Sequence, residues 1–340
     1  MSQRNSIQIK TFALSAVNCY FVVMVTFLAV ILSAHLTTAF AARPVTGEKA
    51  VEGFPYLIIL GITQDGGYPQ AGCRKSCCQA VFEGKRSKKH VASVAIVDPR
   101  TKKRWLIDAT PDFREQLQML DEQFPVDDSL GLAGIFLTHA HIGHYTGLMH
   151  LGREVMGAPG IPVYAMPRML QFLQQNGPWS LLVQLKHIRL VPLEARVQIF
   201  IGDELSVLPI PVPHRDEFSE TVGYLIQGPR QKALYIPDID KWDRWNMKIE
   251  HLITRVDVAF LDGTFYADGE VPGRNMAEIP HPFIVESLRR FSDLPADERN
   301  KIHFIHLNHT NPALHSPGEA AKGIREKGFH IAEEGKIFAL

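Results

Sequence analysis

The chain has 340 residues, and its 36 Lys and Arg balance its 36 Asp and Glu, so the formal net charge at neutral pH is zero. Hydrophobic residues make up 46% and charged residues 21% of the sequence, as in ordinary globular proteins. The length allows one large domain or two small ones, and the lack of a basic excess argues against a nucleic-acid partner.

The N-terminal segment has the pattern of an export signal. Arg4 and Lys10 form a basic start, an apolar stretch follows at about residues 17–34, and residues 39–41 (Ala-Phe-Ala) match a small-x-small cleavage site. We therefore predict a signal peptide over residues 1–41 and a secreted or periplasmic protein. An uncleaved membrane anchor is the alternative, because the apolar stretch approaches the roughly 20 residues that span a bilayer.

Residues 42–54 are predicted to be a linker and residues 55–340 a single domain, since no repeat or further linker interrupts them. Apolar runs predict strands at 56–61, 91–98, 104–108, 133–138, 161–165, 187–191, 205–212, 222–226, 233–236, 256–261 and 302–305. Helical spacing occurs at 112–124, 145–155, 168–176, 241–254, 282–291 and 317–327. Hairpins come first and strands alternate with helices later, which predicts an α/β fold of two packed sheets with helices outside.

Three histidines directly follow the strand predicted at residues 133–138, namely His139, His141 and His144. Alternation along the strand places His139 and His141 on the same side, so both can face one ion, and His144 opens the next helix. Neutral imidazole is a common ligand of zinc and iron, and catalytic zinc sites often use three protein ligands plus water. The segment therefore predicts a catalytic metal site.

This segment resembles the His-x-His-x-Asp-His signature of the metallo-β-lactamase superfamily, and the resemblance extends over about residues 55–340. It implies an αββα sandwich of two mixed sheets, with a metal cleft at one edge. It also implies the metal ligands His214, Asp238 and His306, with Asp238 shared between two ions and orienting the attacking water. Asp108 is implied to support a ligand histidine.

One position departs from that signature, because its aspartate, which normally binds the second ion, is Gly143 here. The ligands of the first ion are all present. The second set is reduced to His144, Asp238 and His306. We therefore expect either one ion or a weak, open second site, unless Asp240 or Asp262 compensates.

Three further segments resemble a narrower branch, that of pyrroloquinoline quinone biosynthesis protein B, with the phosphonate-pathway phosphodiesterase as a neighbouring type. They are residues 66–70 (Gly-Gly-Tyr-Pro-Gln), 262–266 (Asp-Gly-Thr-Phe-Tyr) and 306–312 (His-Leu-Asn-His-Thr-Asn-Pro). The resemblance implies a metal-dependent hydrolase that acts on an ester or phosphodiester of a small molecule, with one or two zinc ions. It also allows an iron-dependent oxygenase, and a non-catalytic binding protein on the same scaffold is a third hypothesis.

The resemblance implies a structural zinc site as well, made by Cys73, Cys77, Cys78 and His309. A disulfide from Cys73 to Cys77 or Cys78 is one alternative, and three free thiols are the other.

Four further features have hypothetical roles. The resemblance implies His281 as the general acid, with packing at a helix start as the alternative. His90 and Tyr266 are additional pocket candidates. Residues 159–191, which contain Trp179, form either a lid or ordinary packing. The sequence leaves the oligomeric state open.

Overall fold

The computed structural model describes residues 53–126, 130–315 and 317–340, which belong to one compact unit. The predicted signal peptide or anchor over residues 1–41, and most of the predicted linker, lie outside these residues. Among the described residues, no helix combines the length and the hydropathy that a bilayer span requires.

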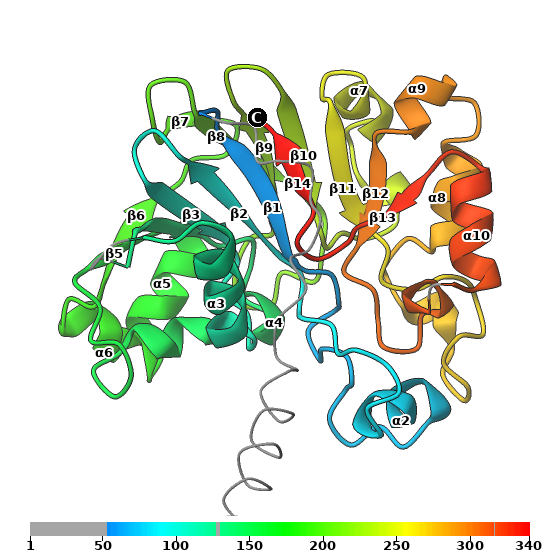
Figure 1. The fold of residues 1–340 in the computed structure, drawn as a ribbon, viewed down its shortest axis with the longest axis horizontal. Coiled ribbons are helices and arrows are strands. Elements are labelled where there is room, and N and C mark those ends of the chain that lie inside the picture. Colours follow the sequence, from blue (N-terminus) through cyan, green and yellow to red (C-terminus); the bar gives the residue numbers. More distant parts are fainter. Residues whose placement is uncertain (1–52, 127–129, 316) are drawn as a thin grey trace, which may run out of the picture. The chain divides into compact units, whose positions relative to one another are not determined.

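Two mixed seven-stranded sheets form the centre of the domain, as the sequence predicted (Figure 1). The first has the order β14-β1-β2-β3-β4-β5-β6 and the second the order β13-β12-β11-β10-β9-β8-β7. The strands of the first sheet are β1 (Tyr56–Gly61), β2 (Ser93–Asp98), β3 (Lys103–Ile107), β4 (Leu132–Phe136), β5 (Ile161–Ala165), β6 (Ile188–Pro192) and β14 (Ile337–Ala339). Those of the second sheet are β7 (Ile199–Phe200), β8 (Ser206–Pro211), β9 (Val222–Gln227), β10 (Lys232–Ile236), β11 (Val258–Asp262), β12 (Ile302–Ile305) and β13 (His330–Ile331).

Strand direction brings the site loops to a common edge in each sheet. β1, β2 and β3 pair antiparallel, whereas β3, β4, β5 and β6 pair parallel. In the second sheet β8, β9 and β10 pair antiparallel, and β10 to β13 pair parallel. The carboxyl ends of β1, β3 and β4 therefore lie at one edge of the first sheet, and those of β8, β10, β11 and β12 at one edge of the second. The loops after these strands carry all the residues predicted for the active-site metals.

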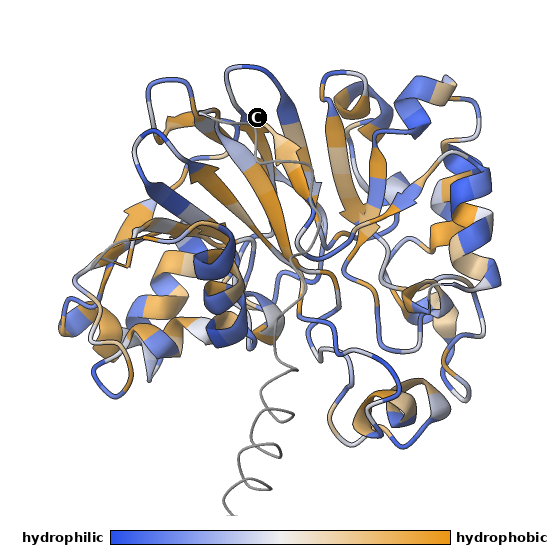
Figure 2. Cartoon of the chain, viewed as in Figure 1, coloured by the Kyte–Doolittle hydropathy of each residue, from blue (hydrophilic) through white to orange (hydrophobic). Residues whose placement is uncertain are grey.

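The core explains why β1 has an uninterrupted apolar sequence. Leu57 and Ile59 belong to the cluster between the two sheets, whereas Tyr56, Ile58 and Leu60 belong to the cluster under the helices of the first sheet. Successive side chains point to opposite faces of a strand, and here both faces are buried. Figure 2 shows the same distribution, with hydrophobic strands inside and hydrophilic helix surfaces outside.

Helices cover the outer faces of both sheets. Those packed with the first sheet are α3 (Phe113–Gln123), α5 (Pro167–Gln175) and α6 (Trp179–Gln184). Those with the second are α7 (Ile249–Ile253), α8 (Ile284–Arg290) and α10 (Glu319–Glu326). Short helices occur at α2 (Ser76–Phe82), α4 (Ile142–Tyr145) and α9 (Ala296–Arg299).

Two predicted helices are wrong in extent. In place of a helix at 145–155, α4 is followed by a 3-10 helix at Thr146–Leu151. In place of one at 241–254, a 3-10 turn at Trp242–Arg244 is separated from α7. Between them, the buried indole of Trp245 donates a hydrogen bond to the Pro211 carbonyl (3.0 Å), so a tertiary contact overrides the local helical preference.

His303 on β12 is a buried histidine away from the site. It stacks on His330 with ring centroids 4.7 Å apart and contacts the rings of Phe260 and Phe338. Burial, followed by the nearby His330 and Lys336, lowers the pKa of His303 to about 3. Between pH 6.5 and 3 the unfolded chain therefore binds a proton that the folded chain does not, and folding stability falls as the pH falls.

We expect the variant His303→Gln to lose less stability on acidification than the parent. The difference should be about 1.4 kcal/mol per pH unit below pH 6.5. Urea unfolding of the metal-depleted protein at pH 7 and pH 5 measures it, with the exposed His251→Gln as the matched control. An unchanged pH slope in His303→Gln would show that His303 does not cause the acid sensitivity.

Candidate metal centre

The first cluster at the strand ends gathers His139, His141, His214 and Asp238. The Nε2 atoms of His139 and His214 lie 3.3 and 3.2 Å from Asp238 Oδ2, and His141 Nδ1 lies 4.0 Å from the same oxygen. All four ligand atoms lie within 4.8 Å of one another. Three imidazoles and one carboxylate around a common point are a ligand set for a single divalent ion.

The second nitrogen of each ring is held by a different partner. His139 Nδ1 lies 3.0 Å from Thr138 Oγ1, and His214 Nδ1 lies 3.3 Å from Asp240 Oδ1. His141 Nε2 lies 3.0 Å from Glu217 Oε2. These contacts fix the ring orientations, so that the opposite nitrogens face the shared carboxylate.

A second cluster combines His144 and His306 with Asp65, a residue of the loop after β1 that the sequence analysis missed. Asp65 Oδ1 lies 3.2 Å from His144 Nε2 and 3.7 Å from His306 Nε2. The two clusters adjoin, because the ring centroids of His139 and His144 are 4.1 Å apart. The only local signal for Asp65 was a polar, Gly-rich loop that follows a buried strand.

Asp108 lies beside the second cluster, since its Oδ2 is 2.7 Å from His144 Nδ1. Its backbone φ is +68°, and that of His306 is +65°. The left-handed region is uncommon for residues other than glycine and is often used at functional sites. In both residues it turns the chain directly after a strand.

The two residues suggested as compensation for Gly143 lie elsewhere. Asp240 contacts His214 and accepts a hydrogen bond from Arg244 (2.9 Å). Asp262 accepts from Thr264 Oγ1 (2.7 Å) and lies 2.9 Å from His281 Nδ1. Neither belongs to the cluster of His144 and His306.

His281 lies within the site, directly before α8. Its Nδ1 is 3.2 Å from Asp238 Oδ1 and 2.9 Å from Asp262 Oδ2, and the side chain is buried. Burial would lower the pKa of His281, but Asp262 and Asp238 raise it. The ring can therefore hold a proton beside the first cluster.

Electrostatics show that the site favours positive charge. Burial would raise the pKa of Asp65, but His144 and His306 hold it well below its usual range. Burial would also raise the pKa of Asp238, but its histidine neighbours hold it well below its usual range. Against the effect of burial, Asp108 and Asp65 raise the pKa of His144 well above its ordinary value. In His139 burial and the nearby His144 lower the pKa, which favours the neutral ring that binds metals.

Several buried polar atoms at the site have no hydrogen-bond partner. They are Asp65 Oδ1, His144 Nε2, His306 Nε2 and Asp238 Oδ1. Buried polar atoms without partners are rare and need a compensating group. Because these are all atoms that can bind a cation, the donor set fits a metal ion.

A separate group of potential ligands consists of Cys73, Cys77, Cys78 and His309, all within 4.8 Å of one another by their ligand atoms. The helix α2 places Cys77 and Cys78 beside Cys73. All three cysteines are free thiols, and the Sγ atoms of Cys73 and Cys77 are 4.0 Å apart. The alternative of a disulfide is therefore not formed in this structure, and the four residues are arranged as a metal site.

The pocket roles of His90 and Tyr266 stay predictions. His90 lies 3.3 Å from Glu334 and belongs to none of these groups, and Tyr266 packs against the main core. Residues 159–191 contain β5, α5 and α6. The Trp179 ring lies 4.8 Å from that of Tyr145, so this segment packs against the helix that carries His144.

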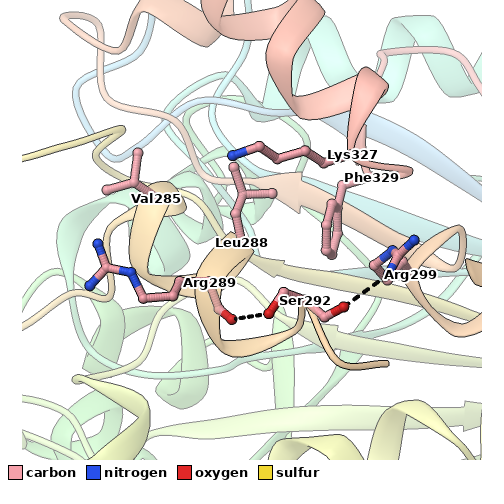
Figure 3. A pocket seen from close by; sticks show the side chains of 7 residues that line it. All are labelled: Val285, Leu288, Arg289, Ser292, Arg299, Lys327 and Phe329. Atoms are coloured by element: carbon pink, nitrogen blue, oxygen red, sulfur yellow. Dashed lines mark hydrogen bonds between the residues drawn. The ribbon is translucent and has the colours of Figure 1, made fainter. Parts of the chain in front are cut away.

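A cavity of about 530 Å³ lies beside α8 and the end of α10 (Figure 3). Its lining residues are Val285, Leu288, Arg289, Ser292, Arg299, Lys327 and Phe329. Arg299 donates to the Ser292 carbonyl (2.9 Å), and none of the lining residues belongs to a potential metal group. The cavity is therefore separate from the metal centre.

Comparison with known proteins places this geometry in a family. Residues 103–304 match the β-lactamase superfamily domain. The chain is 26% identical over 307 residues to a coenzyme PQQ synthesis protein B of Methylobacterium sp. (strain 4-46), covering 83% of this chain and 99% of the relative. The protein of that name from Methylorubrum populi is 27% identical over 310 residues, covering 84% and 100%.

Solved structures show the same fold. A Zn²⁺-bound PqqB from Methylobacterium extorquens has a TM-score of 0.71 at 23% identity, covering 84% of this chain and all of that one. A diphosphatase from the PhnP family has a TM-score of 0.57 at 22% identity, covering 84% and 97%.

The prediction of a signal peptide and of a secreted or periplasmic protein is contradicted by these relatives. The relatives are named for the synthesis of a coenzyme. The match to the first relative covers 99% of that protein but only 83% of this chain. A part of this chain therefore has no counterpart in the first relative.

Three observations indicate the same family: the order of the potential ligands along the chain, the two seven-stranded sheets, and the match over residues 103–304. This chain belongs to the β-lactamase superfamily, and within it the chain resembles PqqB.

Proposed function

We propose that the protein is a zinc-dependent hydrolase that cleaves an ester or phosphodiester bond in a small molecule. The observation that carries the proposal is the arrangement of three imidazole nitrogens around one oxygen of Asp238, beside a second cluster of potential ligands. A divalent ion bound there would lower the pKa of a coordinated water from 15.7 towards about 7, so that hydroxide forms at neutral pH.

The surrounding residues supply orientation and charge. Asp238 Oδ2 would face the ion, while Thr138, Glu217 and Asp240 hold the outer nitrogens of the ligand rings. The names of two structural relatives, a Zn²⁺-bound PqqB and a diphosphatase, support zinc as the metal and a phosphate compound as the substrate class.

We expect the chain, purified without chelators and loaded with zinc, to hydrolyse bis(p-nitrophenyl) phosphate. The variant His139→Ala should lose more than about 100-fold in kcat/KM. Loss of a residue that binds the metal directly should reduce activity more than loss of a residue that only supports a ligand, which typically costs about 10- to 100-fold. Release of p-nitrophenol measures the rate, and the exposed His251→Ala is the matched control.

The same preparation separates the alternatives. Oxygen consumption that requires iron and is lost in His139→Ala would contradict the hydrolase proposal and support an iron-dependent oxygenase. If the purified protein binds no metal, even after incubation with zinc or iron, the hypothesis of a non-catalytic binding protein is supported instead.

We propose His281 as the general acid that protonates the leaving group. The contacts of His281 Nδ1 with Asp262 and Asp238 support this role, since two carboxylates favour the protonated ring. A proton donated from the imidazolium to the departing oxygen leaves a neutral ring, which water can reprotonate.

The test compares leaving groups. In His281→Gln, hydrolysis of an alkyl or phenyl diester should fall by about 100-fold or more, whereas hydrolysis of a p-nitrophenyl diester should fall much less, because p-nitrophenolate leaves without protonation. Metal content should stay at the level of the parent. An equal loss with both leaving groups would mean that His281 acts only by positioning.

We propose further that Cys73, Cys77, Cys78 and His309 hold a structural zinc ion. Three thiolates and one imidazole form a closed set with no open position, so this ion would contribute to folding and not to chemistry. It would connect the loop after β1 to the loop after β12.

The variant Cys73→Ser should lose one zinc ion per chain and unfold at a lower temperature, while the active-site metal remains. Elemental analysis by mass spectrometry and thermal unfolding measure the two effects, with Ser76→Ala, an exposed position at the start of α2, as the control. Unchanged zinc content would exclude the structural site.

A further inference from the structure

We propose that Asp65 is a ligand of a second active-site metal ion, together with His144 and His306, and replaces the aspartate that the family signature places where this chain has Gly143. The inference rests on the proposed metal-dependent function and adds a ligand from a different part of the chain. Asp65 lies outside residues 103–304, the part that matches the superfamily domain.

The space at Gly143 gives the first argument. An ideal Cβ on Gly143 would lie 2.1 Å from Asp65 Oδ1 and 2.6 Å from Asp65 Cα. Real Cβ atoms essentially never approach so closely, so a side chain at position 143 would clash with both the carboxylate and the backbone of Asp65. The carboxylate thus fills the space into which the aspartate of the signature would project.

The orientation of the two histidines gives the second argument. His144 Nδ1 is held by Asp108 (2.7 Å) and His306 Nδ1 by Thr264 Oγ1 (2.9 Å), so the Nε2 atoms of both rings are directed towards Asp65. Asp65 Oδ1 and both Nε2 atoms are buried, and their close contacts with one another (3.2 and 3.7 Å) do not have the geometry of hydrogen bonds. Three atoms of ligand type that face one another and have no partner outside the group are what an ion would satisfy.

The position of the Asp65 loop is fixed by the chain segment that carries His306. Gln64 N donates to the Leu307 carbonyl (2.9 Å), and Leu307 N donates to the Ile62 carbonyl (2.8 Å). The Gln64 side chain donates to Asp65 Oδ2 (3.2 Å), which leaves Oδ1 for the histidines. Asp65 and His306 are therefore held in register by the backbone, as a ligand pair requires.

A two-ion centre has a chemical use in the proposed reaction. Paired ions stabilise both the attacking and the leaving oxygen in phosphoester cleavage, which a single ion does less well. The restored second set therefore favours a phosphodiester over a simple ester as substrate.

The test measures metal content and affinity, not activity. The variants are Asp65→Ala and, as the control, the exposed Asp297→Ala. Zinc per chain is measured by mass spectrometry after equilibration with zinc alone, affinity by competition with a chromogenic chelator, and folding by circular dichroism.

Asp65→Ala should bind one zinc ion fewer than the parent, or bind it more than about 100-fold more weakly, and should keep the ion of His139, His141 and His214. Parental zinc content and affinity in Asp65→Ala would show that Asp65 is only an ion-pair partner of the histidines and would overturn the proposal. Hydrolysis by the parent is scored separately, so the hydrolase proposal can fail while this one holds.

Discussion

The structure depends on one constraint, the burial of several carboxylates and imidazoles at a single edge of the two sheets. Asp108, Asp238 and Asp262 are almost completely shielded from solvent, as are His144 and His306. Unpaired charges are very costly in such a place. Each carboxylate is therefore matched by histidines, and the ring nitrogens that remain unpaired face the points where a cation would lie.

The fold meets this constraint by directing the ends of many strands to the same edge. Antiparallel pairing at one side of each sheet and parallel pairing at the other give the contributing strands a common direction. Asp108 and His306 then adopt positive φ angles directly after β3 and β12. Such conformations cost roughly 1–3 kcal/mol each and persist where the surrounding structure determines them.

In the proposed second site, Asp65 and Gly143 illustrate how a ligand can come from another position in the sequence. A different loop at this edge can supply the carboxylate that faces His144 and His306. Here the loop after β1 does so, and the glycine at position 143 leaves it room. A superfamily signature that begins after this loop does not detect the exchange.

The sequence by itself predicted the two-layered α/β fold, most of the strands, and His139 and His141 on one side of a strand end, because strand periodicity is a local pattern. His214 and Asp238 were implied by the family resemblance and not by a local pattern. Only the tertiary structure decided that Asp65 joins His144 and His306, that Asp240 and Asp262 hold other partners, and that Trp245 interrupts a predicted helix. Trp245 and the Pro211 carbonyl that it contacts are 34 residues apart in the sequence, and Asp65 and His144 are still farther apart. Such contacts depend on the path of the whole chain, and no local preference encodes them.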